Sequence, residues 1–183
     1  PRRWRLCSPR SSDFMITFDT FESPGLIVYP ERVKRNIAKV IEMVNGNPSR
    51  LRPHIKTHKT KEGNDLLLAA GITKFKCATI AEAELLALSE APDVLLSMQL
   101  IGPNLKRFKQ LVLNYPKTSF SSIVDDSFAT DELNRIFEGS ETGVFVDLNM
   151  GMNRTGIKPE RALALIQHIQ TLPNITLRGL HAY

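Results

Sequence analysis

The sequence has little of what secreted and membrane proteins rely on. Among its 183 residues there are only two cysteines, Cys7 and Cys77, too few for a framework of disulfides, so we expect a reducing, cytoplasmic location. No apolar run is long enough for a secretory signal or a membrane span. With 42% hydrophobic and 23% charged residues, the composition is instead that of a globular protein large enough for one well-buried domain.

Several ligand-binding motifs are also missing. No G-x-G-x-x-G or Walker sequence follows a predicted strand, which disfavours a nucleotide-binding sheet, and no H-E-x-x-H sequence indicates a metal-binding helix. Cys77 lies in the apolar run KFKCATI, where we expect a small buried residue rather than a nucleophile. We expect His168, which adjoins the apolar face of the helix ALALIQHIQ, to lie at the surface.

Charge of one sign is concentrated in residues 1–14, PRRWRLCSPRSSDF. This segment holds four arginines and one aspartate, so it carries most of the formal net charge of +5. We expect residues 1–14 to be a disordered or non-native tail, with Met15 as a candidate native start. The tail is too short for us to expect nucleic-acid binding, although it contains Trp4.

From Gly25 onward, short β-rich runs alternate with amphipathic helical patterns. GLIVY at 25–29 predicts a strand, and a helix from Pro30 to Val44 follows and ends before Gly46. Six further strands are predicted around 51–55, 74–78, 93–97, 118–123, 143–148 and 175–180. The strands read as continuous apolar runs, as expected when both faces of a parallel sheet are covered.

The helices between these strands begin at recognisable caps. Thr79-Ile80-Ala81-Glu82 has the spacing of a capping box, and Pro103 lies where a first-turn proline belongs. Pro159 is predicted to open a helix that runs through Ile169.

Repeated strand–helix units are typical of either an open doubly wound sheet or a (β/α)8 barrel. We favour the barrel, because no nucleotide-binding turn is present. About six of the eight units can be counted, and the chain stops at Tyr183, at the end of a predicted strand. An open arc would leave two strand edges and a half-exposed interior, so we expect an incomplete chain.

In a barrel, catalytic residues lie at the carboxyl ends of the strands. The polar residues predicted there are His54, Lys56, His58, Thr79, Gln99, Asp125, Asn149 to Arg154, His181 and Tyr183. Lys56 follows Ile55, at the end of an apolar run, so partial burial and the neighbouring cations Arg52 and Lys59 would disfavour its charged form and free its amine to attack a carbonyl. A solvated basic turn is the alternative interpretation of this lysine.

His54 and His58 are four residues apart, but Pro53 argues against the helix that would align them as metal ligands. We expect His54 either to orient a cofactor or to be packed and hydrogen-bonded.

The segment VFVDLNMGMNRTGI, residues 144–157, runs from an apolar strand into Gly151 and then presents Arg154. The planar guanidinium of Arg154 suits a phenolate, carboxylate or phosphate oxygen, and Asp147 and Asn149 are expected to hold it in place. Taken alone, Arg154 fits the role of a structural ion-pair partner as well as that of a ligand-binding residue.

These segments resemble a known group of enzymes. RPHIKTHKT at 52–60 is similar to the R-P-H-x-K-T-H-K motif of the fold-type III pyridoxal-phosphate enzymes, in the D-threonine aldolase and D-serine dehydratase branch of the alanine racemase-like superfamily. The resemblance extends over almost the whole chain after Met15, through SPGLIVYPERVKRNI, CATIAEAELLA, LLSMQLIGPN, VDLNMGMNRTGI and LRGLHAY.

The resemblance implies roles for individual residues. Pyridoxal 5'-phosphate would be carried on Lys56, with Arg154 at its phenolic oxygen, Tyr183 beside it and His54 as a further cofactor-binding residue. Residues 15–29 would belong with a separate β domain, and residues 30–183 would form an incomplete cofactor-binding barrel of alanine racemase type. A divalent metal is implied for the full-length protein, with ligands outside this chain, so no metal ligand is named here.

The implied activity is a lyase reaction on D-amino acids. We expect cleavage of a D-3-hydroxy amino acid to glycine and an aldehyde, with D-serine dehydratase and amino-acid racemase activities as alternatives. A non-catalytic protein that binds pyridoxal phosphate is the alternative of another class. The expected partners are a small D-amino acid and, at full length, a second copy in a homodimer; neither nucleic acid nor a membrane is expected, and the fragment alone is expected to be inactive.

Overall fold

The computed structural model describes residues 24–25 and 27–183 of the chain. They contain a five-stranded parallel sheet in which the strands follow chain order. The strands are β1 (Lys74–Cys77), β2 (Asp93–Leu96), β3 (Ser119–Val124), β4 (Thr142–Leu148) and β5 (Ile175–Ala182). The strand order never reverses, as it does in a doubly wound sheet, because each new strand is added on the same side. This is the order of a barrel wall, and it confirms the predicted α/β barrel class for part of a barrel.

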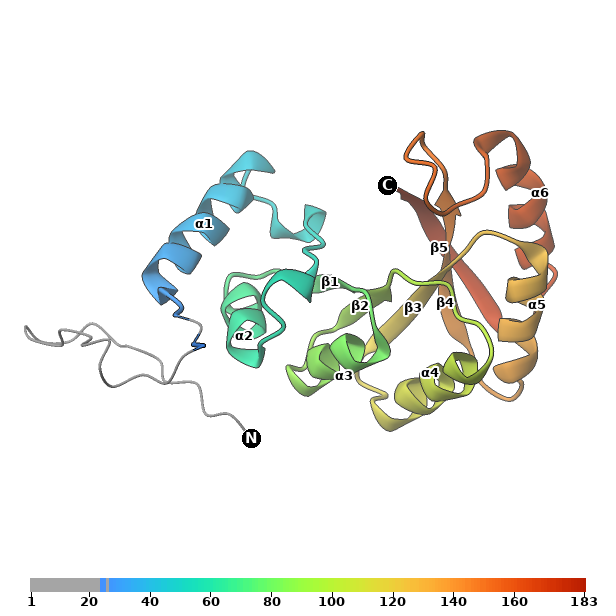
Figure 1. Ribbon diagram of the computed structural model, residues 1–183, viewed down its shortest axis with the longest axis horizontal. Coiled ribbons are helices and arrows are strands. Elements are labelled where there is room, and N and C mark those ends of the chain that lie inside the picture. The colour runs from blue at the N-terminus through green and yellow to red at the C-terminus, as the bar shows by residue number, and fades with distance from the viewer. Residues whose placement is uncertain (1–23, 26) are drawn as a thin grey trace, which may run out of the picture.

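Helices precede β1 and connect the strands. They are α1 (Pro30–Met43), α2 (Lys61–Ala69), α3 (Ile80–Leu88), α4 (Pro103–Asn114), α5 (Ser127–Ile136) and α6 (Pro159–Ile169), with the short 3-10 helices η2 (Pro48–Arg50) and η3 (Ile55–Thr57). From α2 to α6 each helix contacts the next, and Figure 1 shows α3 to α6 following one another along the outside of the sheet. The first helix, α1, lies apart from the sheet and packs on α2.

The helix starts form as the sequence predicts. Thr79 Oγ1 accepts a hydrogen bond from the N–H of Glu82 at 3.1 Å, and Glu82 Oε2 accepts one from the N–H of Ala78 at 2.8 Å. A proline opens α1, α4 and α6, where its missing N–H costs no helical bond. These caps determine the residue at which each helix begins and so the length of the loop between a strand and the helix that follows it.

The main core lies between the sheet and the helices that cover it. Phe108 of α4 packs edge-on against Phe120 of β3, with ring centroids 6.3 Å apart, and its ring lies 5.9 Å from that of Phe137. Phe108 and Phe137 are fully buried, and burying side chains of this size stabilises a fold by about 2 to 3 kcal/mol each. In β1, Phe75 and Cys77 face this core, so the alternating residues of that strand face the inside of the arc.

The strand predicted at 51–55 shrinks to a single bridge between His54 and Lys76. Pro53 has no N–H to offer a ladder, although its carbonyl accepts a hydrogen bond from the N–H of Lys76 at 2.9 Å, and η3 begins directly afterwards. The first of the six predicted barrel units is therefore present only as this bridge and its following helix.

The strand predicted at 25–29 does not join the sheet, since residues 27–29 have no β pairing and Leu26 lies outside the described residues. Residues 1–23 also lie outside them, so the tail and the separate β domain stay predictions. Within the described part, no helix has both the length and the apolar character needed to cross a membrane.

Candidate functional site

The turn 51–60 presents Lys56 at the carboxyl edge of the sheet, beside β1. His54 Nδ1 accepts a hydrogen bond from the N–H of Lys56 at 3.1 Å and thereby caps η3. Ile55 is fully buried and anchors the turn, whereas the side chain of Lys56 is exposed. Lys56 forms no ion pair with any residue that the structure describes, so its amine is accessible at this edge.

The cations that were expected to act on Lys56 are paired with carboxylates. Arg52 donates to both carboxylate oxygens of Asp93, at 2.6 and 3.0 Å, at the amino end of β2. Lys59 Nζ lies 3.1 Å from Oε1 of the buried Glu82. The expected partial burial of Lys56 is wrong, because its side chain is exposed, and each of the two cations is compensated by a carboxylate. Exposure alone makes the amine accessible.

The two histidines of this turn support its backbone. His54 caps η3, and His58 Nδ1 accepts a hydrogen bond from the N–H of Thr60 at 3.3 Å. Burial lowers the pKa of both rings, and the charges of Lys56 and Lys76 lower the pKa of His54 further. No group of three or more residues that could hold a metal is found among residues 24–25 and 27–183.

Three side chains form a hydrogen-bonded chain between distant strands. His181 Nδ1 lies 2.5 Å from Oδ1 of Asp147, its partner in the β4–β5 register, and His181 Nε2 lies 2.6 Å from Nζ of Lys76 in β1. Since β2, β3 and β4 separate β1 from β5 in the sheet, the contact between Lys76 and His181 crosses the inside of the arc. We call Lys76, His181 and Asp147 the cross-sheet triad.

The cross-sheet triad is shielded from water to different degrees along its length. Asp147 is 1% exposed, while Lys76 is half-buried. Burial lowers the pKa of Lys76; the carboxylate of Asp147 opposes this effect, and the charge of Lys56 adds to it. His181 is predicted from the sequence to lie at this edge, whereas Lys76 is not.

Tyr183 borders the triad. Its ring is parallel to that of His181 within 1°, with centroids 6.5 Å apart, and Lys76 Nζ lies 5.3 Å from the centre of the Tyr183 ring. The side chain of Tyr183 remains exposed. The edge therefore combines an accessible amine at Lys56, a shielded amine at Lys76 and a flat aromatic face at Tyr183.

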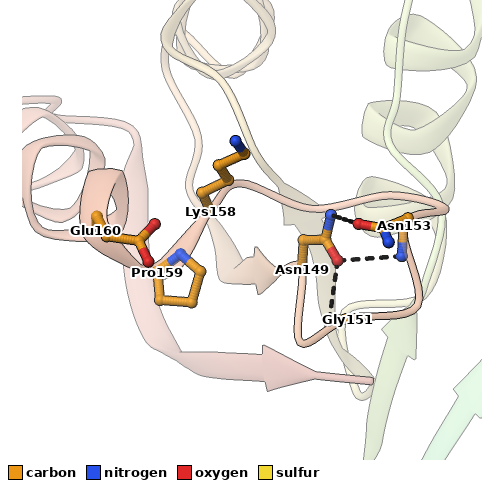
Figure 2. A pocket seen from close by; sticks show the side chains of 6 residues that line it. All are labelled: Asn149, Gly151, Asn153, Lys158, Pro159 and Glu160. Carbon is orange, nitrogen blue, oxygen red and sulfur yellow. Dashed lines mark hydrogen bonds between the residues drawn. The ribbon is translucent and has the colours of Figure 1, made fainter.

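The loop 149–156 is shaped by its own residues. Asn149 Oδ1 accepts hydrogen bonds from the N–H groups of Gly151 and Asn153, both at 3.1 Å, and Asn149 Nδ2 donates to Asn153 Oδ1, as Figure 2 shows. Gly151 turns the chain with φ +108°, a conformation that favours glycine. At the base of the loop, the N–H of Gly156 donates to Oδ2 of Asp125 at 3.0 Å.

Arg154 lies on this loop with its side chain exposed. The two residues that were expected to hold it are engaged elsewhere, Asp147 with His181 and Asn149 with the loop backbone, so that expectation is wrong. The described residues give Arg154 no hydrogen bond or ion pair with the triad. The outer side of the loop carries a shallow pocket of about 410 Å³, lined by Asn149, Gly151, Asn153, Lys158, Pro159 and Glu160 (Figure 2).

Two further predictions concern residues away from the edge. Cys77 is fully buried, as predicted, and burial raises the pKa of its thiol, so it is not a reactive nucleophile. His168 lies at the surface, as predicted, where its Nε2 lies 2.6 Å from Oδ1 of the exposed Asp131 in the neighbouring helix α5. Both residues therefore belong to the structural part of the fold.

Comparisons with known proteins find relatives that act on hydroxy amino acids. The chain is 29% identical over 169 residues to a 3-hydroxy-D-aspartate aldolase of Paracoccus denitrificans, covering 88% of this chain and 43% of the relative. It is 26% identical over 166 residues to a D-threonine aldolase of Arthrobacter sp, with the same coverages. The crystal structure of the D-threonine aldolase from Filomicrobium marinum matches with a TM-score of 0.79 and 27% identity, over 87% of this chain and 43% of that one.

The chain thus spans less than half the length of these relatives. A family model described as alanine racemase, N-terminal domain, matches residues 28–183, which is most of the chain and includes the turn, the triad and the loop. This match and the relatives confirm the resemblance to the fold-type III enzymes of the D-threonine aldolase branch. The chain belongs to the alanine racemase N-terminal domain family.

Proposed function

We propose that this chain is the barrel part of a pyridoxal-phosphate-dependent lyase that cleaves a D-3-hydroxy amino acid to glycine and an aldehyde. The observation that carries the proposal is the accessible amine of Lys56 at the carboxyl edge of a family barrel. The names of the relatives, 3-hydroxy-D-aspartate aldolase and D-threonine aldolase, support the substrate class. The relatives are named as enzymes, which favours an enzyme over a non-catalytic binding protein of similar fold.

The residues at the edge fit the cofactor. Lys56 offers a primary amine, the group that pyridoxal phosphate needs for covalent attachment, and the buried Ile55 and the cap from His54 hold its backbone. The exposed ring of Tyr183, which is parallel to that of His181, adds an aromatic face at the same edge, suited to an aromatic ring. When bound, pyridoxal phosphate supplies an electron sink for the bond-breaking step.

Each residue then has a defined task. Lys56 holds the cofactor, His54 fixes the direction in which Lys56 leaves the turn, and Tyr183 borders the ring. Arg154 is proposed to donate hydrogen bonds to an oxygen of the cofactor, for which its planar guanidinium is suited. This role requires the loop to present Arg154 to the edge, because its side chain is exposed and bonds to no residue of the triad in the described part.

The remaining predictions concern the whole protein. Relatives of more than twice this length carry residues that this chain does not match, so the divalent metal and the homodimer inferred from the resemblance remain part of the proposal. No residue of the described part is assigned to the metal.

The proposal is tested by product analysis. The purified full-length protein, loaded with pyridoxal phosphate and assayed with and without a divalent metal, is expected to release glycine and acetaldehyde from D-threonine. Lys56→Ala is expected to abolish this activity, whereas the matched control Lys61→Ala, which removes an exposed lysine paired with Asp65, is expected to retain it.

Other products would decide between the alternatives. Pyruvate from D-serine without glycine from D-threonine would assign a dehydratase, and exchange of the α-proton with no cleavage would assign a racemase. Cofactor bound to Lys56 with no turnover of any D-amino acid would assign a binding protein. Full activity of Lys56→Ala would contradict the proposal.

A further inference from the structure

Lys76 lies in β1 with its side chain on the inside of the sheet arc, an unusual position for a lysine. Lys74 and Lys76 alternate in β1 with the buried Phe75 and Cys77, so both lysines face the inside of the arc. Lys76 Nζ lies 2.6 Å from His181 Nε2 and 5.3 Å from the centre of the Tyr183 ring. The amine is therefore held at the same edge that presents Lys56, but by a second set of contacts.

The hydrogen bonds of the triad fix where its protons lie. Asp147 is buried, and as a carboxylate it can only accept, so Nδ1 of His181 carries a hydrogen that it donates to Oδ1. Nε2 of His181 then accepts a hydrogen bond from the ammonium of Lys76, or donates one to its neutral amine. In either case one proton lies between Nε2 and Nζ, and Asp147 keeps the imidazole in the required orientation.

The charged groups around Lys76 have opposite effects on its pKa. Lys56 and His54 face it from the turn, and Asp147 faces it from β4. His181 of β5 and Tyr183, which follows β5, complete its surroundings. Burial and the charge of Lys56 favour the neutral amine, while Asp147 favours the ammonium. The net effect lowers the pKa of Lys76 below the ordinary value of a lysine, the direction in which an amine becomes a better general base.

We propose that Lys76 is a catalytic proton carrier that takes the proton of the substrate's 3-hydroxyl and returns it to Cα, with His181 and Asp147 as positioning residues. This inference rests on the proposed lyase function. The hydroxyl proton passes to the Lys76 amine, the Cα–Cβ bond breaks and leaves its electron pair on Cα, and the C–O bond becomes a carbonyl. The ammonium of Lys76 then protonates Cα to give glycine, so that atoms and charge balance without a further reactant.

The first test needs neither cofactor nor turnover. Side-chain NMR of 15N-labelled lysines would follow the titration of Lys76, whose signal is identified by its loss in Lys76→Met. We expect Lys76 to titrate below the ordinary range of a lysine amine, and Asp147→Asn to move its titration lower still, because a stabilising negative charge is removed. Lys76 titrating together with the exposed lysines, or unmoved by Asp147→Asn, would overturn the inference.

The second test separates proton transfer from structure. In the loaded enzyme, Lys76→Met is expected to lower kcat by about 10² to 10³ while cofactor attachment to Lys56 is retained. The matched control Lys74→Met removes a lysine from the same strand and face and is expected to leave kcat within about twofold. Asp147→Asn is expected to move the pH at which kcat rises in the same direction as the Lys76 titration.

Further outcomes are decisive as well. If Lys76→Met does not fold, His181→Gln replaces it and is expected to lower kcat and to shift the pH profile. Unchanged kcat and pH profile in Lys76→Met or His181→Gln would overturn the role of Lys76. Failure to attach the cofactor to Lys56 in the unmodified protein would instead refute the proposed function, while the NMR titration would still decide whether the triad holds a shifted amine.

Discussion

The turn 51–60 and the loop 149–156 both lie at the carboxyl edge of the sheet, but different kinds of contact hold them. The turn is fixed by residues far away in the sequence: Arg52 binds Asp93, Lys59 binds Glu82, and His54 bridges to Lys76. The loop is shaped mainly by bonds within itself, around the side chain of Asn149, and is tied to the neighbouring unit at its base through Gly156.

The two kinds of contact give Lys56 and Arg154 different freedom of position. Long-range contacts break only when a large part of the fold opens, whereas local bonds can open with little cost to the rest of the molecule. Lys56, which is proposed to carry the cofactor covalently, lies on the fixed segment. Arg154 lies on the segment that is free to adjust, which suits a residue that has to approach a cofactor after it binds.

The largest loss of folding stability is expected from a substitution at the base of the loop 149–156. A Cβ on Gly156 would lie 2.6 Å from the backbone of Leu148 and Asn149, and φ is +99°, so Gly156→Ala is expected to destabilise the fold by about 3 kcal/mol. Gly151→Ala has similarly positive φ but nothing within 4 Å of its Cβ, and about 1 kcal/mol is expected. Urea unfolding measures the free energy of unfolding of both variants. Equal losses of stability would mean that the close backbone contact at Gly156 does not hold the loop in place.

The next largest loss of stability is expected when the ion pair between Arg52 and Asp93, which anchors the turn 51–60, is removed. Asp93→Asn removes the charge that Arg52 binds through two hydrogen bonds while keeping the shape of the side chain, and it is expected to cost about 2 kcal/mol. The matched control Asp65→Asn breaks the exposed pair with Lys61 and is expected to cost less than about 0.5 kcal/mol. If both variants unfold at the same urea concentration, the turn is not held through Arg52.

A smaller change in the free energy of unfolding is expected when the pH is lowered. The pKa values of His54 and His58 are lowered below the usual 6.5 in the folded chain, so the unfolded chain binds protons more readily in acid. The free energy of unfolding should therefore fall as the pH drops from 7.5 to 5.5. Urea unfolding of a double variant, His54→Gln with His58→Gln, should show a weaker pH dependence, and an unchanged dependence would exclude these rings as its source.

The smallest effect on stability is expected inside the loop. Asn149→Ala removes bonds among exposed loop residues and is expected to change the free energy of unfolding by less than about 1 kcal/mol. It should nevertheless increase cleavage of residues 149–156 by a protease under native conditions. A loss as large as that of Asp93→Asn would mean that the loop and the turn are held equally firmly.

The sequence predicts the helices better than the strands. Proline and capping residues define α6 over Pro159–Ile169 as observed, and α1 ends one residue earlier than expected. The strand at 51–55 is lost because Pro53 interrupts the ladder and His54 caps a 3-10 turn instead. Local signals decide where helices start, but ladder formation depends on a partner strand that the local pattern does not specify.

The candidate site is predicted only in part. The RPHIKTHKT motif identifies Lys56, and the strand pattern places His181 and Tyr183 at the edge, but Lys76 is missed because its partner lies 105 residues away in the sequence. A signal for Lys76 exists in KFKC, where lysines alternate with buried residues and must face the inside of a barrel. The partners of Asp147 and Asn149 depend on how β4 and its loop pack, which spacing alone does not determine.

Lys56 is proposed to be the residue that carries the cofactor. The proposal is tested by incubating the purified full-length protein with pyridoxal phosphate, reducing it with borohydride and locating the modified lysine by peptide mapping. We expect label on Lys56, no label in Lys56→Ala, and unmodified Lys76 in both. Label on Lys76, or on any lysine other than Lys56, would contradict it.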